Sequence, residues 1–410
     1  MRDRSNALPG VEADDEPEAI VCHVDMDCFY AACERLREPA LDGQAVVVGM
    51  GYEPDDDGGV VATASYEARE HGVHSAQPIS DALARLPRAS VMPPDYVGPV
   101  AHYRPVDMGY YQSVSREVLA VLEGFADAMR VASLDEAYLD LTEQTTWADA
   151  EAFGRELKAA VESTVGVTAS VGIAPTRGVA KIASDHDKPD GLTVVPPGDV
   201  GDFLAGRPVE DLHGVGPVTA EALRDLDLPH IDDVAATDPA ILVEHFGDRG
   251  RELAARARGE GSTEVTPQGL PKSLSRESSL GSGTDDPEVV RERIAELARA
   301  VASRANRKGA SYRTVGIKVV TPPFDVNTRE RSFGGPFADA ALVERTALEL
   351  VEEFAGETVR KVGVRVANLD FAPEQASLGE YTGDGASAAA PPSQWGQRRL
   401  SEFERGGRED

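Results

Sequence analysis

Two short acidic motifs within apolar stretches limit the possible folds of this chain more than any other feature. Residues 24–30 read Val-Asp-Met-Asp-Cys-Phe-Tyr and continue a β-rich run that begins at residue 19, and residues 133–141 read Ser-Leu-Asp-Glu-Ala-Tyr-Leu-Asp-Leu. Both stretches are predicted to be strands. Because ionised carboxylates on buried strands are costly unless they are paired or bind a metal, we expect the two motifs to lie side by side.

The acids of these motifs predict a divalent-cation site. Carboxylate oxygens suit Mg²⁺, which usually keeps coordination positions for substrate phosphates, and two such ions a few ångströms apart promote in-line displacement at phosphorus. The alternative is that all of them are ordinary strand-end acids in a very acidic protein. The acids concerned are Asp25, Asp27, Asp135, Glu136 and Asp140.

The two motifs together resemble a known family. Asp-Met-Asp-x-Phe-Tyr-Ala at residues 25–31, followed by Ser-Leu-Asp-Glu-Ala-Tyr-Leu-Asp at residues 133–140, is similar to the palm of the Y-family DNA polymerases, the translesion enzymes of the DNA polymerase IV type. The pair of motifs is highly specific to that family. The resemblance extends over residues 19–371, nearly the whole chain that is expected to be ordered.

The resemblance implies a template-directed, error-prone DNA polymerase that adds dNTPs to a primer 3′-hydroxyl and has no proofreading exonuclease. By the family's motif, Asp25 and Asp135 would bridge two Mg²⁺ ions. Glu136 would complete the site of the ion that activates the 3′-hydroxyl, and the backbone carbonyl of Met26 would be a further ligand. Asp27 and Asp140 are left as structural acids.

An aromatic pair follows the first motif. Phe-Tyr at a strand-to-helix junction is more often part of a core, but the resemblance implies that Tyr30 is a steric gate under the sugar of the incoming nucleotide. There a 2′-hydroxyl would clash, which gives discrimination by repulsion. Phe29 would pack against the same nucleotide.

The stretch 62–69, Ala-Thr-Ala-Ser-Tyr-Glu-Ala-Arg, is similar to the fingers motif of the family. It implies that Thr63, Tyr66 and Arg69 contact the β- and γ-phosphates of the nucleotide. Tyr66 and Arg69 are three residues apart and so share a helix face. Ala62 would lie near the replicating base pair. Lys181 would reach the triphosphate from the palm. The alternative for Arg69 is a solvated arginine on a surface helix. The alternative for Lys181 is an ordinary lysine on a helix surface.

The net charge of −30 is unexpected for a nucleic-acid-binding protein, since phosphate contacts need Lys and Arg. Only 7 of the 41 basic residues are lysines, and the acids are spread along the chain. This pattern is typical of a high-salt cytoplasm, where charge repulsion is screened, and it indicates a halophilic archaeon. Residues 270–371 hold 16 basic and 15 acidic residues, so DNA contacts outside the catalytic cleft are expected there.

Helical and strand patterns alternate along the chain, which predicts an α+β fold of the right-hand polymerase type. The expected segments are a disordered acidic N-terminus (1–18), a palm (19–36 and 96–192), fingers (37–95), a helix-hairpin-helix thumb (193–261), a linker (262–272), a little finger with a four-stranded sheet (273–371) and a flexible tail (372–410). Extra residues around 95–105 depart from the shorter family pattern, which leaves the alignment of Arg104 open.

Two regions are expected to grip primer-template DNA. A Gly-x-Gly turn opens a predicted helix after residue 212, and its amides suit a backbone phosphate, although a plain helical corner would show the same pattern. Alternating apolar and basic residues after residue 272 predict a basic sheet face. The candidate DNA contacts are Gly214, Gly216, Lys272, Arg276, Arg329 and Arg331.

The tail carries two candidate peptides for a PCNA-like sliding clamp. Both have Gln-x-x-Leu-x-x-aromatic spacing, and each lacks the second aromatic residue of a full motif. The first follows directly after the last predicted strand. The residues concerned are Gln375, Leu378 and Tyr381, and Gln397, Leu400 and Phe403.

No run of eighteen apolar residues and no apolar leader occurs, so we expect a cytoplasmic protein without membrane contact, acting as a monomer. Cys22, Cys28 and Cys33 are interpreted as buried thiols, in preference to a zinc site with His23. Two other functions remain open. An inactive scaffold would have lost an acidic ligand, and a nucleotidyl cyclase with a related palm would need no DNA-gripping thumb.

Overall fold

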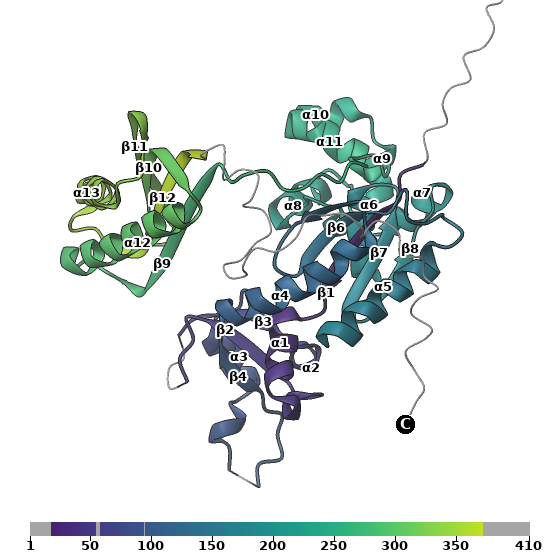
Figure 1. Ribbon diagram of the computed structural model, residues 1–410, viewed down its shortest axis with the longest axis horizontal. Helices are drawn as coiled ribbons and strands as arrows, with labels where there is room; N and C mark the ends of the chain where they lie inside the picture. The colour runs from purple at the N-terminus through teal and green to yellow at the C-terminus, as the bar shows by residue number, and fades with distance from the viewer. Residues whose placement is uncertain (1–17, 55–57, 94, 372–410) are drawn as a thin grey trace, which may run out of the picture. The chain divides into compact units, whose positions relative to one another are not determined.

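The computed structural model describes residues 18–54, 58–93 and 95–371, and these form two compact units (Figure 1). The first unit ends at Gln268 and the second begins at Gly269. The boundary falls within the segment 262–272 that the sequence predicts to be a linker.

A five-stranded sheet is the centre of the first unit (Figure 1). β1 occupies the middle position and pairs antiparallel with a neighbour on each side. In order across the sheet, the strands are β5 (Ala128–Val131), β6 (Glu136–Asp140), β1 (Val21–Met26), β7 (Ala169–Ala174) and β8 (Leu192–Val194). The central strand is buried along its whole length, which explains why its sequence is almost continuously apolar.

Helices cover both faces of this sheet. On one face, Cys22, Val24 and Met26 pack into a core with α1 (Phe29–Arg37), α4 (Met108–Leu122) and α5 (Ala150–Val165). On the other face, α6 (Arg177–His186) packs against β7 and β1. Because side chains alternate along a strand, Val21, His23 and Asp25 point to the α6 side.

Gly172 in the middle of β7 allows α6 to approach the sheet closely. A Cβ atom there would lie 2.2 Å from the carbonyl oxygen of Ala180 and 2.3 Å from the amide nitrogen of Ser184. The Gly172→Ala substitution is therefore expected to lower the free energy of unfolding by about 3 kcal/mol, because the helix must move away. Urea unfolding measures this loss, and Gly178→Ala, where a Cβ meets nothing within 4 Å, is the control.

A smaller three-stranded sheet is inserted between β1 and β5 and has its own core. Its strands are β2 (Val46–Met50), β3 (Val60–Ala64) and β4 (His102–Pro105), and its helices are α2 (Tyr66–Arg69) and α3 (Ile79–Arg85). β4 pairs parallel with β2. The prediction that this segment ends at residue 95 is therefore wrong, because backbone pairing extends it to Pro105. Arg104 forms an ion pair with Glu38.

Short helices follow the five-stranded sheet and pack into the core on the α6 side. They are α7 (Val200–Leu204), α8 (Pro217–Arg224), α9 (Ile231–Ala236), α10 (Pro239–Phe246) and α11 (Asp248–Ala257). Gly214, with φ of 90°, turns the chain before α8, and Gly247, with φ of 63°, turns it between α10 and α11. Left-handed backbone of this kind strains residues that carry a Cβ, so glycine is required there.

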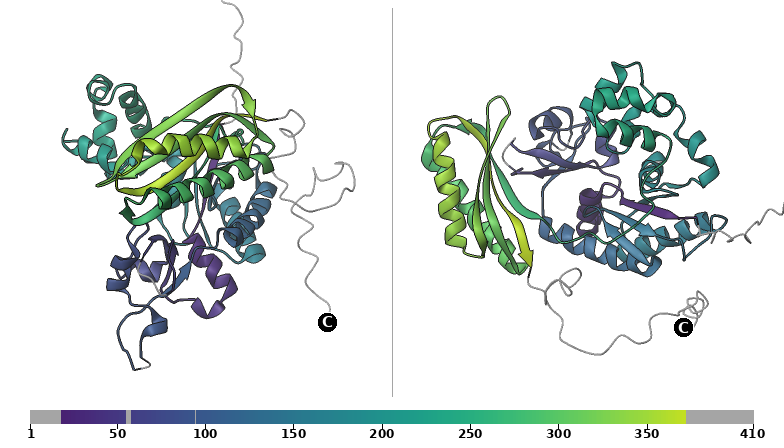
Figure 2. Two further views of the ribbon diagram at one scale, coloured as in Figure 1. Left: turned by 90° about the vertical axis from the view of Figure 1, so that its left-hand side faces the viewer. Right: turned by 90° about the horizontal axis from the view of Figure 1, so that it is seen from above.

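The second unit is a four-stranded antiparallel sheet with two helices on one face (Figure 2). The strands, in order, are β11 (Asp325–Phe337), β10 (Ala310–Thr321), β12 (Val359–Phe371) and β9 (Ser273–Thr284), and the helices are α12 (Pro287–Arg307) and α13 (Ala340–Val351). Val315, Ile317 and Val319 of β10 face these helices in the core. Among residues 269–371, no helix lies on the opposite face.

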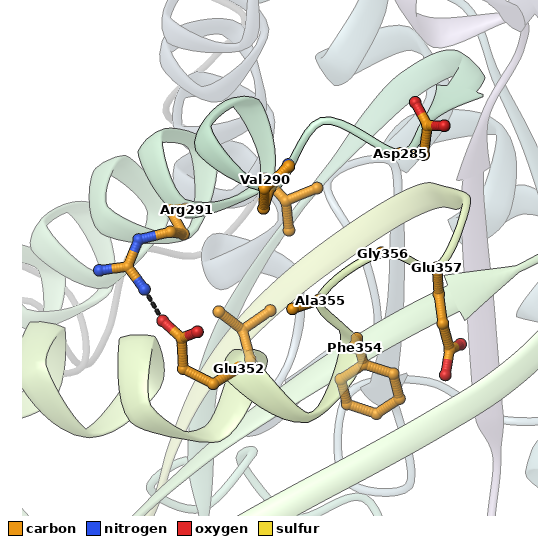
Figure 3. A pocket seen from close by; sticks show the side chains of 10 residues that line it. Asp285, Val290, Arg291, Glu352, Phe354, Ala355, Gly356 and Glu357 are labelled. Carbon is orange, nitrogen blue, oxygen red and sulfur yellow. Dashed lines mark ion pairs between the residues drawn. The ribbon is translucent and has the colours of Figure 1, made fainter.

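A small hollow lies beside the first turn of α12 (Figure 3). Arg291 and Glu352 face each other at its rim as an ion pair. Its volume of about 20 Å³ has room for roughly one water molecule, so it is a packing defect and not a ligand site. In the part of the chain that the structure describes, no helix has the length and hydrophobicity needed to span a bilayer.

Candidate active site

The register of the central strands brings the two acidic motifs together. Asp25 of β1 lies directly opposite Glu136 of β6, so the two side chains are neighbours on the α6 side of the sheet. The amide nitrogen of Met26 donates to the carbonyl oxygen of Asp135 at 2.9 Å, which fixes Asp135 beside the end of β1. Asp25 is only 6% exposed.

Two lysines lie on these carboxylates. Lys181 of α6 places its Nζ 2.8 Å from Asp25 Oδ2 and 2.5 Å from Glu136 Oε1. Lys188, just after α6, places its Nζ 2.7 Å from the same Asp25 oxygen. Both ammonium groups also contact Asp185, at 3.4 Å for Lys181 and 2.7 Å for Lys188.

These contacts determine the ionisation of the site. Burial alone would raise the pKa of Asp25, but the ammonium groups of Lys181 and Lys188 outweigh it and hold that pKa at about 2. Burial raises the pKa of Glu136, and the neighbouring Asp25 adds to the effect, against the hydrogen bond from Lys181. The carboxylates raise the pKa of Lys181 despite its burial, so it stays charged.

The donor set fits a hard divalent cation, because cationic groups already lie on the oxygens that such an ion would use. The carboxylate of Asp135 has a partner of its own, since its Oδ1 accepts a hydrogen bond from Ser133 Oγ at 2.5 Å. With the lysines in place, residues 18–54, 58–93 and 95–371 contain no group of three acids, cysteines or histidines arranged around a common metal position. Metal binding therefore requires these side chains to move.

Asp27 and Asp140 have structural hydrogen bonds. Asp27 is 7% exposed and accepts from Ser170 Oγ at 2.9 and 3.0 Å, and from the amide of Asp190 at 2.8 Å. Asp140 Oδ1 accepts from the amide and hydroxyl of Thr142. Both carboxylates are thus held within the protein, in agreement with their interpretation as structural acids.

Tyr30 lies at the start of α1 and is only partly buried. Cys28 adopts a left-handed conformation, with φ of 47°, as the chain turns from β1 into this helix. The Tyr30 ring stacks on Tyr111 with centroids 4.5 Å apart and planes 15° apart, and the Tyr111 hydroxyl donates to Glu34 at 2.6 Å. Phe29 is 2% exposed within the core, so its side chain has almost no free surface, and its contact with a nucleotide stays a prediction.

The predicted phosphate contacts lie on β3 and α2. Ala62 and Thr63 are partly exposed on the strand. The Tyr66 hydroxyl donates to Asp27 Oδ1 at 3.0 Å, so in this state it is engaged with the protein. The guanidinium of Arg69 lies 4.8 Å from the centre of the Tyr66 ring, and its Nε donates to the carbonyl of Ala64.

The sequence interpretation missed Lys188. It assigned a role to Lys181 but not to the lysine seven residues later, which reaches the same carboxylate. The signal was available, because a chain with seven lysines places two of them within eight residues.

The interpretation also missed a hollow of about 370 Å³ beside the site. It lies between the sheet and the short helices, with Glu136 and Lys181 on one side and His213 and Arg256 on the other. Arg256 donates to the carbonyl of His213 at 3.0 Å. Burial lowers the pKa of His213, and the Arg256 charge adds to this.

The predicted DNA contacts lie in different environments. Gly216 caps α8, and a Cβ there would meet nothing within 4 Å, so its backbone is open to a ligand. The carbonyl of Gly214 accepts from Arg249 at 2.6 Å. Lys272 is exposed just before β9, and Arg276 is exposed on β9 opposite the core residue Val364, which places it on the helix side.

Arg329 and Arg331 of β11 do not belong to a basic open face, and this prediction is wrong. Arg329 pairs with the core residue Ile317 across the sheet, so its side chain lies on the helix-covered side. It forms an ion pair with Glu353, and Arg331 forms one with Glu349 at 2.5 Å. The open face instead carries the basic residues Lys318, Lys361 and Arg365, as their alternation with core residues requires.

The six predicted clamp-binding residues lie outside the described residues. They are Gln375, Leu378, Tyr381, Gln397, Leu400 and Phe403.

Comparisons with known proteins agree with this architecture. The impB/mucB/samB family matches residues 24–185, its C-terminal domain matches residues 271–378, and the helix-hairpin-helix motif of the same family matches residues 197–228. Among curated proteins, a DNA polymerase IV of Halobacterium salinarum is 57% identical over 92% of this chain and 91% of its own length. A DNA polymerase IV of Methanoculleus marisnigri is 39% identical over 88% of this chain and 98% of its own.

Solved structures of Y-family DNA polymerases also match this chain. A Y-family DNA polymerase chimera of Dbh and Dpo4 matches with a TM-score of 0.75 and 28% identity, covering 86% of this chain and all of the chimera. An insertion ternary complex of Dbh DNA polymerase matches with a TM-score of 0.61 and 27% identity over the same share of this chain. The acidic strand motifs, the inserted three-stranded sheet, the helical hairpins and the C-terminal sheet therefore place this chain in the Y family of DNA polymerases, among those of the DNA polymerase IV type.

Proposed function

We propose that this chain extends a DNA primer opposite a template by nucleotidyl transfer from dNTPs, as a translesion polymerase. The observation that carries the proposal is the register of β1 and β6, which sets Asp25 opposite Glu136 on the α6 side of the palm sheet. The helical thumb and the little-finger sheet supply surfaces that a nucleotidyl cyclase would not need. An inactive scaffold is disfavoured because none of the three acids is missing.

Y-family polymerases generally depend on divalent metal ions, and we propose two Mg²⁺ ions for this chain. Asp25, Asp135, Glu136 and the backbone carbonyl of Met26 would hold them. When bound, such ions lower the pKa of the primer 3′-hydroxyl and offset the negative charge on the α-phosphate and the leaving pyrophosphate.

The other residues of the site would position the nucleotide. The exposed edge of Tyr30 would lie under the sugar, held in place by the stacked ring of Tyr111. Lys181 and Lys188 would provide positive charge for the triphosphate, and Arg69 would do so from the fingers. Thr63 and Tyr66 would add hydroxyl donors, the latter after leaving Asp27, and Ala62 would leave space at the base pair.

Primer-template DNA would lie on the thumb and the little finger. The amides at Gly214 and Gly216 would face a backbone phosphate, and Lys272 would add a charge before β9. The helix-free face of the little finger, with Lys318, Lys361 and Arg365, would contact the duplex backbone. The charge of residues 270–371 as a whole is close to balanced, unlike that of the rest of the chain.

Two arginines test which face of the little finger binds DNA. Arg365→Ala is expected to weaken DNA binding and to reduce the slope of log affinity against log salt by about one, because one phosphate contact is lost. Arg331→Ala is the matched control, since Arg331 is paired with Glu349 on the other face. Fluorescence anisotropy at several KCl concentrations measures both. An equal loss in the two variants would contradict the assignment of the face.

Primer extension tests the function itself. The full chain with Mg²⁺ in molar KCl should add the nucleotide complementary to each of four template bases, should continue past an abasic site, and should stop when EDTA is added. Addition independent of the template base would contradict the proposal. Formation of a cyclic nucleotide from a triphosphate without DNA would favour the cyclase alternative.

The remaining expectations belong to the same proposal. The division into palm, fingers, thumb and little finger would follow the sheets, with β4 as the last part of the fingers. The enzyme would act as a monomer in the cytoplasm of a salt-loving archaeon, and its tail would dock on a PCNA-like clamp. The Gln-x-x-Leu-x-x-aromatic spacing at residues 375–381 and 397–403 supports the clamp contact.

A further inference from the structure

We propose that Lys181 and Lys188 act as exchangeable internal cations on the catalytic carboxylates, and that Asp185 receives their ammonium groups when a metal ion displaces them. The inference rests on the proposed function, since it takes Asp25 and Glu136 to be metal ligands. In this role Asp185 is a positioning residue, because it acts through the lysines and not on the substrate.

The ammonium groups use the same oxygens that a metal would need. Asp25 Oδ2 accepts from Lys181 at 2.8 Å and from Lys188 at 2.7 Å, while Glu136 Oε1 accepts from Lys181 at 2.5 Å. A Mg²⁺–oxygen bond is about 2.0–2.1 Å long, so an ion on these atoms leaves no position for the nitrogen. Occupation by lysine and occupation by metal therefore exclude each other.

The geometry also provides a second place for each ammonium group. Asp185 follows Lys181 by one helical turn, and its two carboxylate oxygens already lie 3.4 Å from Lys181 Nζ and 2.7 Å from Lys188 Nζ. Its side chain is 48% exposed, whereas that of Asp25 is 9% exposed. A short swing of two flexible side chains moves both charges from the buried acid to the outer one without moving the helix.

Such an exchange prevents uncompensated charge in either state. Without a metal, the buried carboxylates keep cationic partners, which their burial requires. With a metal, the repelled ammonium groups keep Asp185 and become available to the phosphates that arrive with the ion. Metal and triphosphate binding are then coupled, and the coupling must be reciprocal.

The chemistry predicts opposite effects for two substitutions. Lys181→Met removes one of the two competing cations, the one that lies on both Asp25 and Glu136, so the variant should bind Mn²⁺ about fivefold to tenfold more tightly than the wild type in the absence of nucleotide. Asp185→Asn removes the negative charge of the outer acceptor, so both ammonium groups stay on Asp25 and Mn²⁺ should bind more weakly by a similar factor. A lysine with a purely structural role would give no gain in the first variant.

The experiment is a titration of the full chain with Mn²⁺ in molar KCl, without DNA or nucleotide, in which electron paramagnetic resonance counts the free ion. Lys308→Met, the same change at an exposed lysine in the other unit, is the matched control and should not change the affinity. Thermal unfolding gives a second readout: Lys181→Met should lower Tm without metal, and saturating Mn²⁺ should restore it.

The outcomes separate the exchange from the function. Equal Mn²⁺ affinity in the wild type and in the Lys181→Met and Asp185→Asn variants would overturn the exchange while leaving the metal site intact. The Asp25→Asn variant tests the metal site itself. If this variant binds Mn²⁺ as tightly as the wild type does, the proposed metal site is overturned. If Lys181→Met does not fold, as judged by circular dichroism, then Lys181→Gln and Asp185→Asn carry the same opposite expectations.

Discussion

The Asp135→Asn variant is expected to extend primers about a thousandfold more slowly than the wild type. Asparagine keeps the shape of the side chain and can accept the hydrogen bond that Ser133 gives to the carboxylate at present. It removes the negative charge that would bind both ions, and loss of electrostatic stabilisation at a transition state costs a factor of this order. Single-nucleotide addition under saturating dNTP, with Mg²⁺ in molar KCl, measures the rate.

The control is Asp140→Asn, the same change at the other end of β6. The Asp140 carboxylate accepts from Thr142, and an amide oxygen can do the same. This variant should retain nearly full activity and an unchanged unfolding midpoint. Full activity in Asp135→Asn would refute the proposed metal site, and equal losses in both variants would point to a general effect on the fold.

The Tyr30→Ala variant should incorporate ribonucleotides about a hundredfold more readily relative to deoxyribonucleotides, which corresponds to about 2.7 kcal/mol. The gate acts by repulsion, so its removal relieves the clash with a 2′-hydroxyl without adding a contact. The stacked neighbour Tyr111 stays in place through its hydrogen bond to Glu34, which keeps the rest of the pocket in order. The measurement is the ratio of kcat/KM for dNTP and rNTP.

Tyr110→Ala is the matched control for the gate. This ring is adjacent in sequence to Tyr111 but packs against Arg37, with 3.8 Å between the guanidinium carbon and the ring centre. Its removal should leave sugar selection unchanged. If Tyr30→Ala selected sugars as well as the wild type does, discrimination would have to come from another residue.

The strands that carry the carboxylates could be predicted from the sequence, because apolar runs interrupted by acids have few explanations. The pairing of Asp25 with Glu136 follows from two strands that must both face a common site. The lysines are different. Lys188 lies beyond the end of α6, and only the path of the chain after His186 returns its ammonium group to Asp25. Helical periodicity contains no information about that path.

The little finger shows a second limit. Alternation in β11 separates two faces but does not say which one the helices cover, because this strand is polar on both sides. The face is known only from the register of the sheet, in which Arg329 pairs with the core residue Ile317. An irregularity between Tyr312 and Thr314 shifts this register, and the sequence does not reveal it. Similarly, the boundary of the fingers depended on β4, a four-residue strand whose pairing with β2 joins distant segments. Contacts of this kind depend on tertiary structure.

The central position of β1 has a consequence for how the protein is made. The ribosome releases this strand early, but its partner β6 begins at Glu136 and β7 only at Ala169. Pairing over such a separation is slow to form and needs the later segments to be present. A chain that ends before Ala169 lacks β7 beside β1 and cannot form the sheet that holds the catalytic carboxylates, so an error-prone enzyme gains activity only after that sheet has been synthesised.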